Sequence, residues 1–164
     1  QAFRAFAALD TRQTVLRRAL ADRTCGELRV HTTIEQELFY PAARRQLGAR
    51  LLLDEAEVEH GAAETLMTQL TDLRPSDPKF AAIFLVLGEY VKHHIAEEQH
   101  TIFPRIARAD DLDWEALAAR IAKRRAELTQ QLLPPGSEEH WIRIIERAMN
   151  ADPIAGDSAS LTSH

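Results

Sequence analysis

The sequence predicts an all-α protein, most simply an antiparallel helical bundle with additional helices at the C-terminal end. Apolar residues recur every three or four positions along several long segments, which is the period of an amphipathic helix. Turns rich in proline, glycine and aspartate separate these segments, as at Arg74–Pro78 and Pro134–Gly136. No segment alternates apolar and polar residues as a strand does, and we find no internal repeat.

Composition narrows the class of protein. The chain has 164 residues, 45% of them hydrophobic, enough to bury a core. A formal net charge of −5 argues against binding to nucleic acid or to anionic membranes, and no apolar run has the length of a transmembrane helix. The single cysteine, Cys25, suits a reducing compartment. We therefore expect a cytoplasmic protein, with an upstream targeting segment left open because Gln1 is not an initiator residue.

The first helices follow from the apolar period and its interruptions. Residues 1–9 are typical of the end of a helix, and Asp10 and Thr11 form a break. A long helix is expected from Arg12 to the mid-forties, with a kink or an end near Tyr40 because Pro41 lies inside it.

The third helix is expected over residues 53–73. One stripe of it carries charged residues as well as apolar ones: Leu53, Glu57, His60, Glu64 and Met67. The fourth helix is expected to begin at Pro78 with Asp77 as its N-cap and to end near Pro104. Its predicted inner face consists of Phe80, Phe84, Leu87, Val91, His94, Glu98 and Ile102.

Two further helices complete the prediction. One spans about residues 113–133, and a short one follows Ser137, its expected N-cap. The tail from Ala151 is small and polar, so we expect it to be mobile. We accordingly divide the chain into a helical bundle at 1–133 and a C-terminal helix with its tail at 134–164, and this C-terminal helix is a possible homodimer contact.

Histidine and glutamate occur four residues apart on three of the predicted helices. The pairs are His31/Glu35, His60/Glu64 and His94/Glu98, with His93/Glu97 as a fourth, overlapping pair. Residues four apart stand on the same face of a helix, so each pair can point at one spot.

Periodicity separates the two pairs on the fourth helix. His94 and Glu98 continue its apolar face and are placed inside, whereas His93 falls on a polar face at the rim or in solvent. We interpret four other glutamates as solvated: Glu37, Glu55, Glu59 and Glu97.

Three buried imidazoles and three buried carboxylates require a positive charge between them. Nitrogen and oxygen ligands without thiolates favour iron, manganese or zinc. Two divalent ions carry four positive charges, of which the three carboxylates would offset three, so the sequence predicts a site for two metal ions.

The amino-acid sequence around the three pairs resembles the hemerythrin-like (HHE cation-binding) domain family over about residues 1–104. The similar segments are HTTIEQELFYPA at 31–42, EVEHGAAETL at 57–66 and HHIAEEQHTIFP at 93–104. The resemblance implies a four-helix bundle with a non-haem di-iron centre, bridged by carboxylates and an oxo or hydroxo group, which binds dioxygen or a related oxidant or senses iron or redox state. The ligands it implies are His31, Glu35, His60, Glu64, His94 and Glu98, with Glu35 and Glu98 bridging.

Two departures from the family pattern shape the expectation. The family takes a further histidine from its first helix, and none precedes His31 here, so we expect that ligand upstream of Gln1 and an incomplete site in this chain. The oxygen-carrying members have histidine at the position of Glu64, so a site richer in carboxylate favours sensing, storage or oxidative chemistry over oxygen transport.

Three alternatives stay open at this stage. The same centre would also serve a di-iron oxidase, a peroxidase or an iron-oxidising protein. A ferritin-like arrangement uses Glu-x-x-His on two helices, which Glu57/His60 and Glu97/His100 satisfy. A metal-free helical interaction module is the third.

Overall fold

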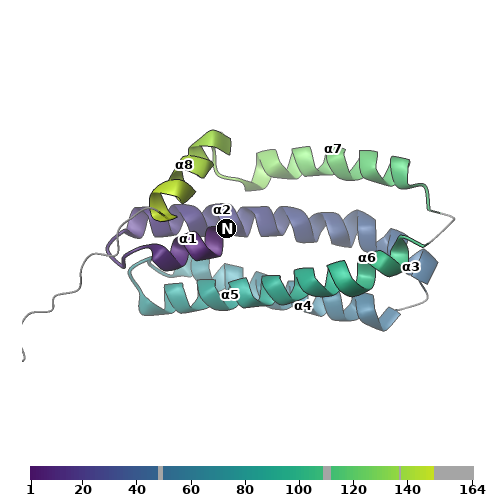
Figure 1. Cartoon of the computed structure of the whole chain (residues 1–164), viewed down its shortest axis with the longest axis horizontal. Helices are drawn as coiled ribbons and strands as arrows, with labels where there is room; N and C mark the ends of the chain where they lie inside the picture. Colours follow the sequence, from purple (N-terminus) through teal and green to yellow (C-terminus); the bar gives the residue numbers. More distant parts are fainter. Residues whose placement is uncertain (48–49, 109–111, 137, 150–164) are drawn as a thin grey trace, which may run out of the picture.

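The structure, a computed structural model, describes residues 1–47, 50–108, 112–136 and 138–149. Every regular element within these residues is helical, as predicted (Figure 1). The long helices are α2 (Thr14–Ile34), α4 (Arg50–Asp72), α5 (Pro78–Glu97) and α7 (Trp114–Leu132). The shorter elements are α1 (Ala2–Ala8), α3 (Tyr40–Leu47), α6 (Phe103–Ile106), α8 (Glu138–Met149) and two π-helical turns, η1 (Glu35–Phe39) and η2 (Glu98–Ile102).

Successive long helices run antiparallel, and α7 lies along α2 on the side away from α4 and α5 (Figure 1). The short α1 packs beside α2 and α5, and α8 covers α1 and α2. Trp141 of α8 is buried, with the Arg23 guanidinium of α2 over its ring. Among the helices that the structure describes, none combines the length and apolar character that crossing a bilayer requires.

One predicted helix cap is confirmed, and a second helix has a cap that was not predicted. The Asp77 carboxylate accepts a hydrogen bond from the backbone N–H of Lys79, and the Asp113 carboxylate accepts one from Ala116. The predicted cap at Ser137 and the tail from Ala151 lie outside the described residues.

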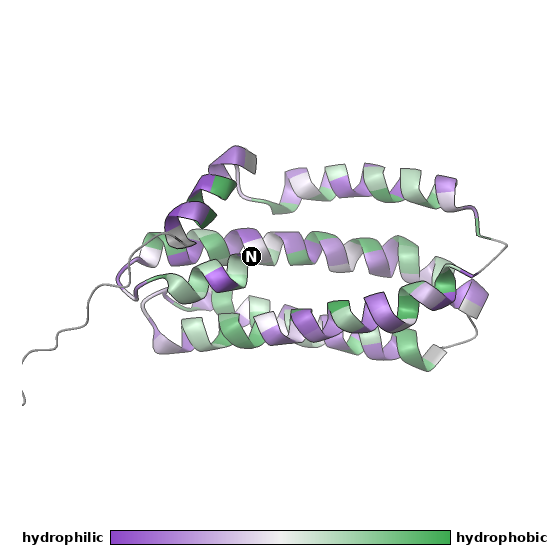
Figure 2. Ribbon diagram, in the orientation of Figure 1, coloured by the Kyte–Doolittle hydropathy of each residue, from purple (hydrophilic) through white to green (hydrophobic). Residues whose placement is uncertain are grey.

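Among the described residues the core has three apolar clusters, and a polar layer lies between the two larger ones. Each helix carries apolar and polar residues in turn along its length (Figure 2). The first cluster includes Phe6, Leu20, Met67, Leu70, Phe80, Phe84 and Leu87. The second includes Phe39, Tyr40, Leu53, Ala56, Ile102 and Ile106. Along α2, α4 and α5 the histidines fall between these clusters, so apolar side chains enclose the polar layer from both ends.

Proline explains where the α-helical hydrogen bonding changes. Instead of ending near Tyr40, the second helix widens into η1, in which the Tyr40 N–H donates to the Glu35 carbonyl, and then continues as α3. A proline in a helix interior lacks an N–H and clashes with the carbonyl four residues earlier, and the wider turn accommodates Pro41. The Phe103 N–H donates to the Glu98 carbonyl in the same way before Pro104.

Candidate metal centre

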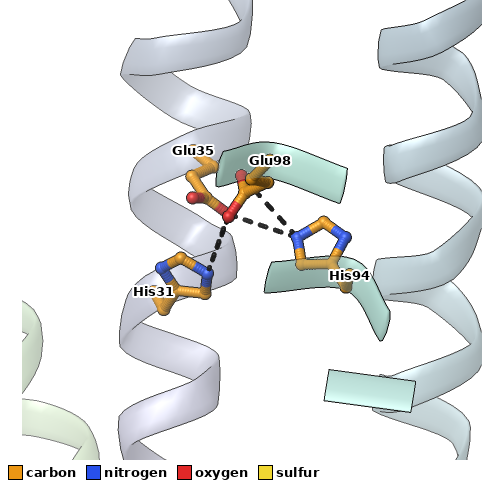
Figure 3. A group of neighbouring side chains, drawn as sticks. All are labelled: His31, Glu35, His94 and Glu98. Atoms are coloured by element: carbon orange, nitrogen blue, oxygen red, sulfur yellow. Dashed lines mark ion pairs between the residues drawn. The ribbon is translucent and has the colours of Figure 1, made fainter. Parts of the chain in front are cut away.

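Five side chains from three helices converge on the polar layer. His31 and Glu35 come from α2 and η1, His60 from α4, and His94 and Glu98 from α5 and η2; Figure 3 shows the four that come from α2, α5 and the π turns. Glu35, His60, His94 and Glu98 are buried, whereas about a third of the His31 side chain is exposed (34%). The centre is thus dry on most sides and open at His31.

Each glutamate faces histidines on two sides. Glu98 Oε2 lies 3.8 Å from His31 Nε2, while its other oxygen, Oε1, lies 3.7 Å from His94 Nε2 (Figure 3). Glu35 Oε2 lies 3.3 Å from the Nε2 atoms of both His31 and His60, and 4.0 Å from that of His94. A carboxylate placed between two sets of imidazoles has the layout of a bridging metal ligand.

The three histidines form two groups. The rings of His60 and His94 lie 4.6 Å apart between centroids, while His31 stands 6.4 Å and 6.3 Å from them. The two glutamates occupy the space between these groups. The arrangement therefore offers two neighbouring metal positions, one at His31 and one at His60 and His94.

Several buried polar atoms in this layer lack a hydrogen-bond partner within the described part of the chain. They include His31 Nε2, Glu35 Oε2 and Glu98 Oε1, all of which face the centre. Native proteins rarely leave buried polar atoms unpaired, and a metal ion satisfies such atoms as ligands. This donor set of imidazole nitrogen and carboxylate oxygen fits a first-row transition metal.

The protonation equilibria of the buried groups suit a site for a cation. Burial raises the pKa of Glu35 to about 7, and burial together with the neighbouring Glu35 carboxylate raises the pKa of Glu98 to about 8. Burial, followed by the nearby His60 and His94, lowers the pKa of His31 to about 4, so its imidazole stays neutral and able to bind a metal. A cation between the carboxylates would favour their ionised forms.

Glu59 orients His94, a role that the sequence reasoning missed by treating it as a solvated residue. The Nδ1–H of His94 donates to Glu59 Oε2 at 2.8 Å, which leaves Nε2 facing the centre. A carboxylate on the far nitrogen fixes the tautomer and the ring orientation of a metal-binding histidine. Glu59 therefore supports the centre from outside.

Glu64 is a correction, because the structure does not bring it to the centre. Its exposed carboxylate accepts three hydrogen bonds from Arg29, the shortest at 2.9 Å. The stripe predicted for this helix is right at Leu53, His60 and Met67 and wrong at Glu57 and Glu64. The buried residues are Leu53, Ala56, His60, Ala63, Met67 and Leu70. Ala56 and Ala63 thus take the inward positions that the prediction gave to Glu57 and Glu64. Glu64 lies on the outer face of the helix, where it contacts Arg29.

Tyr40 is a second residue that sequence reasoning missed. Its side chain is fully buried, its ring stacks on His60 at a centroid distance of 5.5 Å, and its hydroxyl lies 3.4 Å from His60 Nε2. Burial, followed by the nearby Glu35, raises the pKa of Tyr40 well above its usual range, so the phenol stays protonated.

A short repeat marks the two glutamates of the centre and was also overlooked. Residues 31–41 and 94–104 share the pattern His-x-x-x-Glu-Gln-x-x-(Phe/Ile)-(Tyr/Phe)-Pro. In both copies the glutamate opens a π turn. π turns are rare and concentrate at functional sites, so the repeat is a signal for this centre that the sequence contains.

The ferritin-like alternative finds no support in the positions of its residues. Glu57 is exposed and pairs with Arg44, and His100 is exposed. The expectation that His93 lies in solvent is confirmed, because 67% of its side chain is exposed.

A narrow pocket of about 20 Å³ reaches the centre from the surface. Its walls are largely apolar, and no lysine or arginine is among the described residues that line it. The described residues that line the pocket are Leu28, His31, Thr32, Glu59, His60, Ala63, Tyr90, Val91, His94 and Ile95. A volume of this size holds about one water-sized molecule.

Comparison with known proteins identifies the family. The profile of the hemerythrin HHE cation binding domain matches residues 1–106. The chain belongs to this family. A crystal structure of a hemerythrin HHE cation binding domain-containing protein from Mycobacterium kansasii is similar in fold, with a TM-score of 0.63 and 22% identity over 90% of this chain and 89% of that one. None of the curated proteins matches significantly.

The metal-free HHE protein is expected to lose stability as the pH rises from 6.5 to 8. Folded Glu35 and Glu98 keep protons up to pH values of about 7 and 8, whereas the unfolded chain releases them near 4.5, so each rise in pH favours unfolding. His31 affects stability only below its ordinary pKa of 6.5. There the unfolded chain takes up a proton that folded His31, with its pKa lowered to about 4, does not bind, so acid weakens the fold.

Thermal unfolding of chelator-treated protein at several pH values measures this slope. Glu98→Gln should flatten it, whereas Glu64→Gln, at an exposed carboxylate, should leave it unchanged. Added metal should reverse the slope, because protons then compete with the ion for the ligands. A metal-free protein that becomes more stable between pH 6.5 and 8 would contradict this account of the two carboxylates.

Proposed function

We propose that the chain holds a non-haem di-iron centre that binds dioxygen or a related small oxidant, or senses iron or redox state. The observation that carries the proposal is Glu98, whose two oxygens face histidines on opposite sides of the centre. His31 would hold one ion, His60 and His94 the other, and Glu35 and Glu98 would lie between them. Iron would supply reversible one-electron chemistry and affinity for oxygen.

The surroundings of the centre support a small, uncharged ligand. The pocket of about 20 Å³ has room for one diatomic molecule or peroxide. Its walls offer no lysine or arginine among the described residues, so it has no feature that would hold an anion such as phosphate. Three histidines and two glutamates are too few to saturate two ions, which leaves coordination positions for such a ligand.

The position of Glu64 changes the balance between the possible roles. A third carboxylate at the centre was the reason to place oxygen transport last. Because Glu64 pairs with Arg29 instead, that reason is removed, and oxygen binding stands beside sensing.

Mixing the anaerobic ferrous protein with oxygen tests the proposal. A carrier or sensor should develop an optical change that depends on the centre and is absent in Glu98→Gln. A carrier should recover the starting spectrum on degassing, and a redox sensor on reduction. A ferrous protein whose spectrum and oxidation rate equal those of free iron would refute oxygen binding.

Peroxide or ferrous-iron turnover is the second candidate, and Tyr40 is the observation that favours it. The hydroxyl lies beside His60 and is kept protonated by burial, with its pKa raised, so it offers a hydrogen-bond donor to a small ligand at the edge of the centre. Tyr40→Phe should then lower turnover without changing metal content. If the loaded wild type turns over no faster than free iron, the oxidase and peroxidase functions are excluded.

A further inference from the structure

A second group of metal-binding side chains lies outside the buried centre. It consists of Glu59 on α4 with His93 and Glu97 on α5, and we call it the outer cluster. His93 Nε2 lies 3.7 Å from Glu59 Oε1 and 3.9 Å from Glu97 Oε1, and one ligand atom from each residue lies within 4.8 Å of the other two.

These distances suit a shared ion. Two ligand atoms that each lie about 2.1 Å from a tetrahedral ion are about 3.4 Å apart. The two separations from His93 Nε2 to the glutamates exceed this by a few tenths of an ångström, and a side chain as exposed as that of His93, at 67%, can close such a gap by rotation.

The ion pairs of the outer cluster differ from those of several other surface glutamates. Glu37, Glu57 and Glu64 each pair with an arginine, which neutralises them. By contrast, every ion pair that the described residues form with Glu59 or Glu97 runs to a histidine. The cluster thus combines two carboxylates that pair with no described lysine or arginine and the imidazole nitrogen of His93, which are ligands that a divalent transition-metal cation takes.

Glu59 belongs to both groups. Its Oε2 accepts the hydrogen bond from His94 Nδ1, while its Oε1 faces His93. The geometry points to a second, solvent-accessible site for a divalent transition-metal ion, formed by Glu59, His93 and Glu97 and joined to the buried centre through the Glu59 carboxylate. An ion at Oε1 draws electron density from this carboxylate and weakens its hydrogen bond to His94, so occupancy outside alters the ligand inside.

Equilibrium dialysis of the full chain against Zn²⁺ tests the outer site. The wild type should bind zinc in a tight phase and in a weaker phase of one ion. His93→Gln and Glu97→Gln should each weaken the second phase by more than roughly tenfold, since a lost ligand costs at least as much as a lost outer-sphere partner. Glu89→Gln removes an exposed carboxylate from the same helix, one that pairs with Lys92, and should bind like the wild type.

The same titration separates this inference from the di-iron proposal. Glu98→Gln should lose the tight phase and keep the weak one, and absence of a tight phase in the wild type would count against the buried centre alone. A weak phase that persists unchanged in His93→Gln and Glu97→Gln overturns the outer site. Both substitutions are at partly or largely exposed side chains, so the fold is not at risk. As a coupling readout, filling the outer site should shift the optical spectrum of Co²⁺ at the buried centre in wild type but not in His93→Gln.

Discussion

Glu98→Gln is expected to abolish metal-dependent stabilisation and to leave the metal-free protein folded. Glu98 faces histidines on both sides of the centre, so its loss affects both metal positions. Free metal at a hundred times its dissociation constant adds about 2.7 kcal/mol to the stability of a protein that binds it only when folded. The wild type should show this gain in thermal unfolding under anaerobic conditions with ferrous iron, and the variant should show none.

The metal-free variant provides an internal control. Burial and the Glu35 carboxylate raise the pKa of Glu98 to about 8. Above that pH, and without metal, the charge of Glu98 destabilises the fold. The neutral glutamine removes this charge, and the metal-free variant should unfold at the same temperature as the wild type or higher. A lower unfolding temperature at high pH would mean that Glu98 stabilises the fold without metal.

Glu64→Gln is the matched control for the metal-bound state. It carries the same chemical change at an exposed residue that pairs with Arg29, so metal-dependent stabilisation should persist and the intrinsic loss should stay within about 1 kcal/mol. If Glu64→Gln lost the metal while Glu98→Gln kept it, the geometric assignment would be reversed. If neither wild type nor variants gained stability from metal, the chain would be the metal-free interaction module.

Glu59→Ala is expected to weaken metal binding at the buried centre by roughly 10- to 100-fold, the usual cost of losing the partner that orients a metal-binding histidine. The hydrogen bond from His94 Nδ1 to Glu59, at 2.8 Å, fixes the nitrogen that faces the centre. Competition with a chelator of known affinity measures the change.

Glu59→Gln should lie between the wild type and Glu59→Ala, because the amide oxygen still accepts the hydrogen bond but carries no charge. Glu55→Ala removes an exposed carboxylate one helical turn earlier and should leave the affinity unchanged. Equal affinities in Glu59→Ala and wild type would show that His94 keeps its orientation without Glu59.

Residue spacing predicted the buried face correctly on α5 and only in part on α4. On α5 and η2 the predicted face from Phe80 to Ile102 is the face that the structure buries, with Val91 partly buried, although other apolar residues of α5, such as Leu85 and Val86, are exposed. On α4 two stripes share Leu53, His60 and Met67, one completed by glutamates and the other by alanines. Only packing against the neighbouring helices selects the alanine stripe, so Glu64 was misplaced.

The remaining features of the centre depend on contacts between distant segments. Glu59 has the sequence environment of a solvated residue, and only the approach of α5 brings His94 to it. Tyr40 reaches His60 because η1 lets the chain continue past Pro41. The two π turns could have been predicted from the sequence, because both lie within the shared pattern that ends at Pro41 and at Pro104.

The iron content of the chain after anaerobic loading with ferrous iron and removal of excess metal tests the central claim most directly. We predict two irons per chain in the wild type, with charge-transfer bands in the near ultraviolet after oxidation, and neither iron nor bands in Glu98→Gln. A wild type that retains no iron, or that retains as much iron as Glu98→Gln, would contradict the di-iron centre.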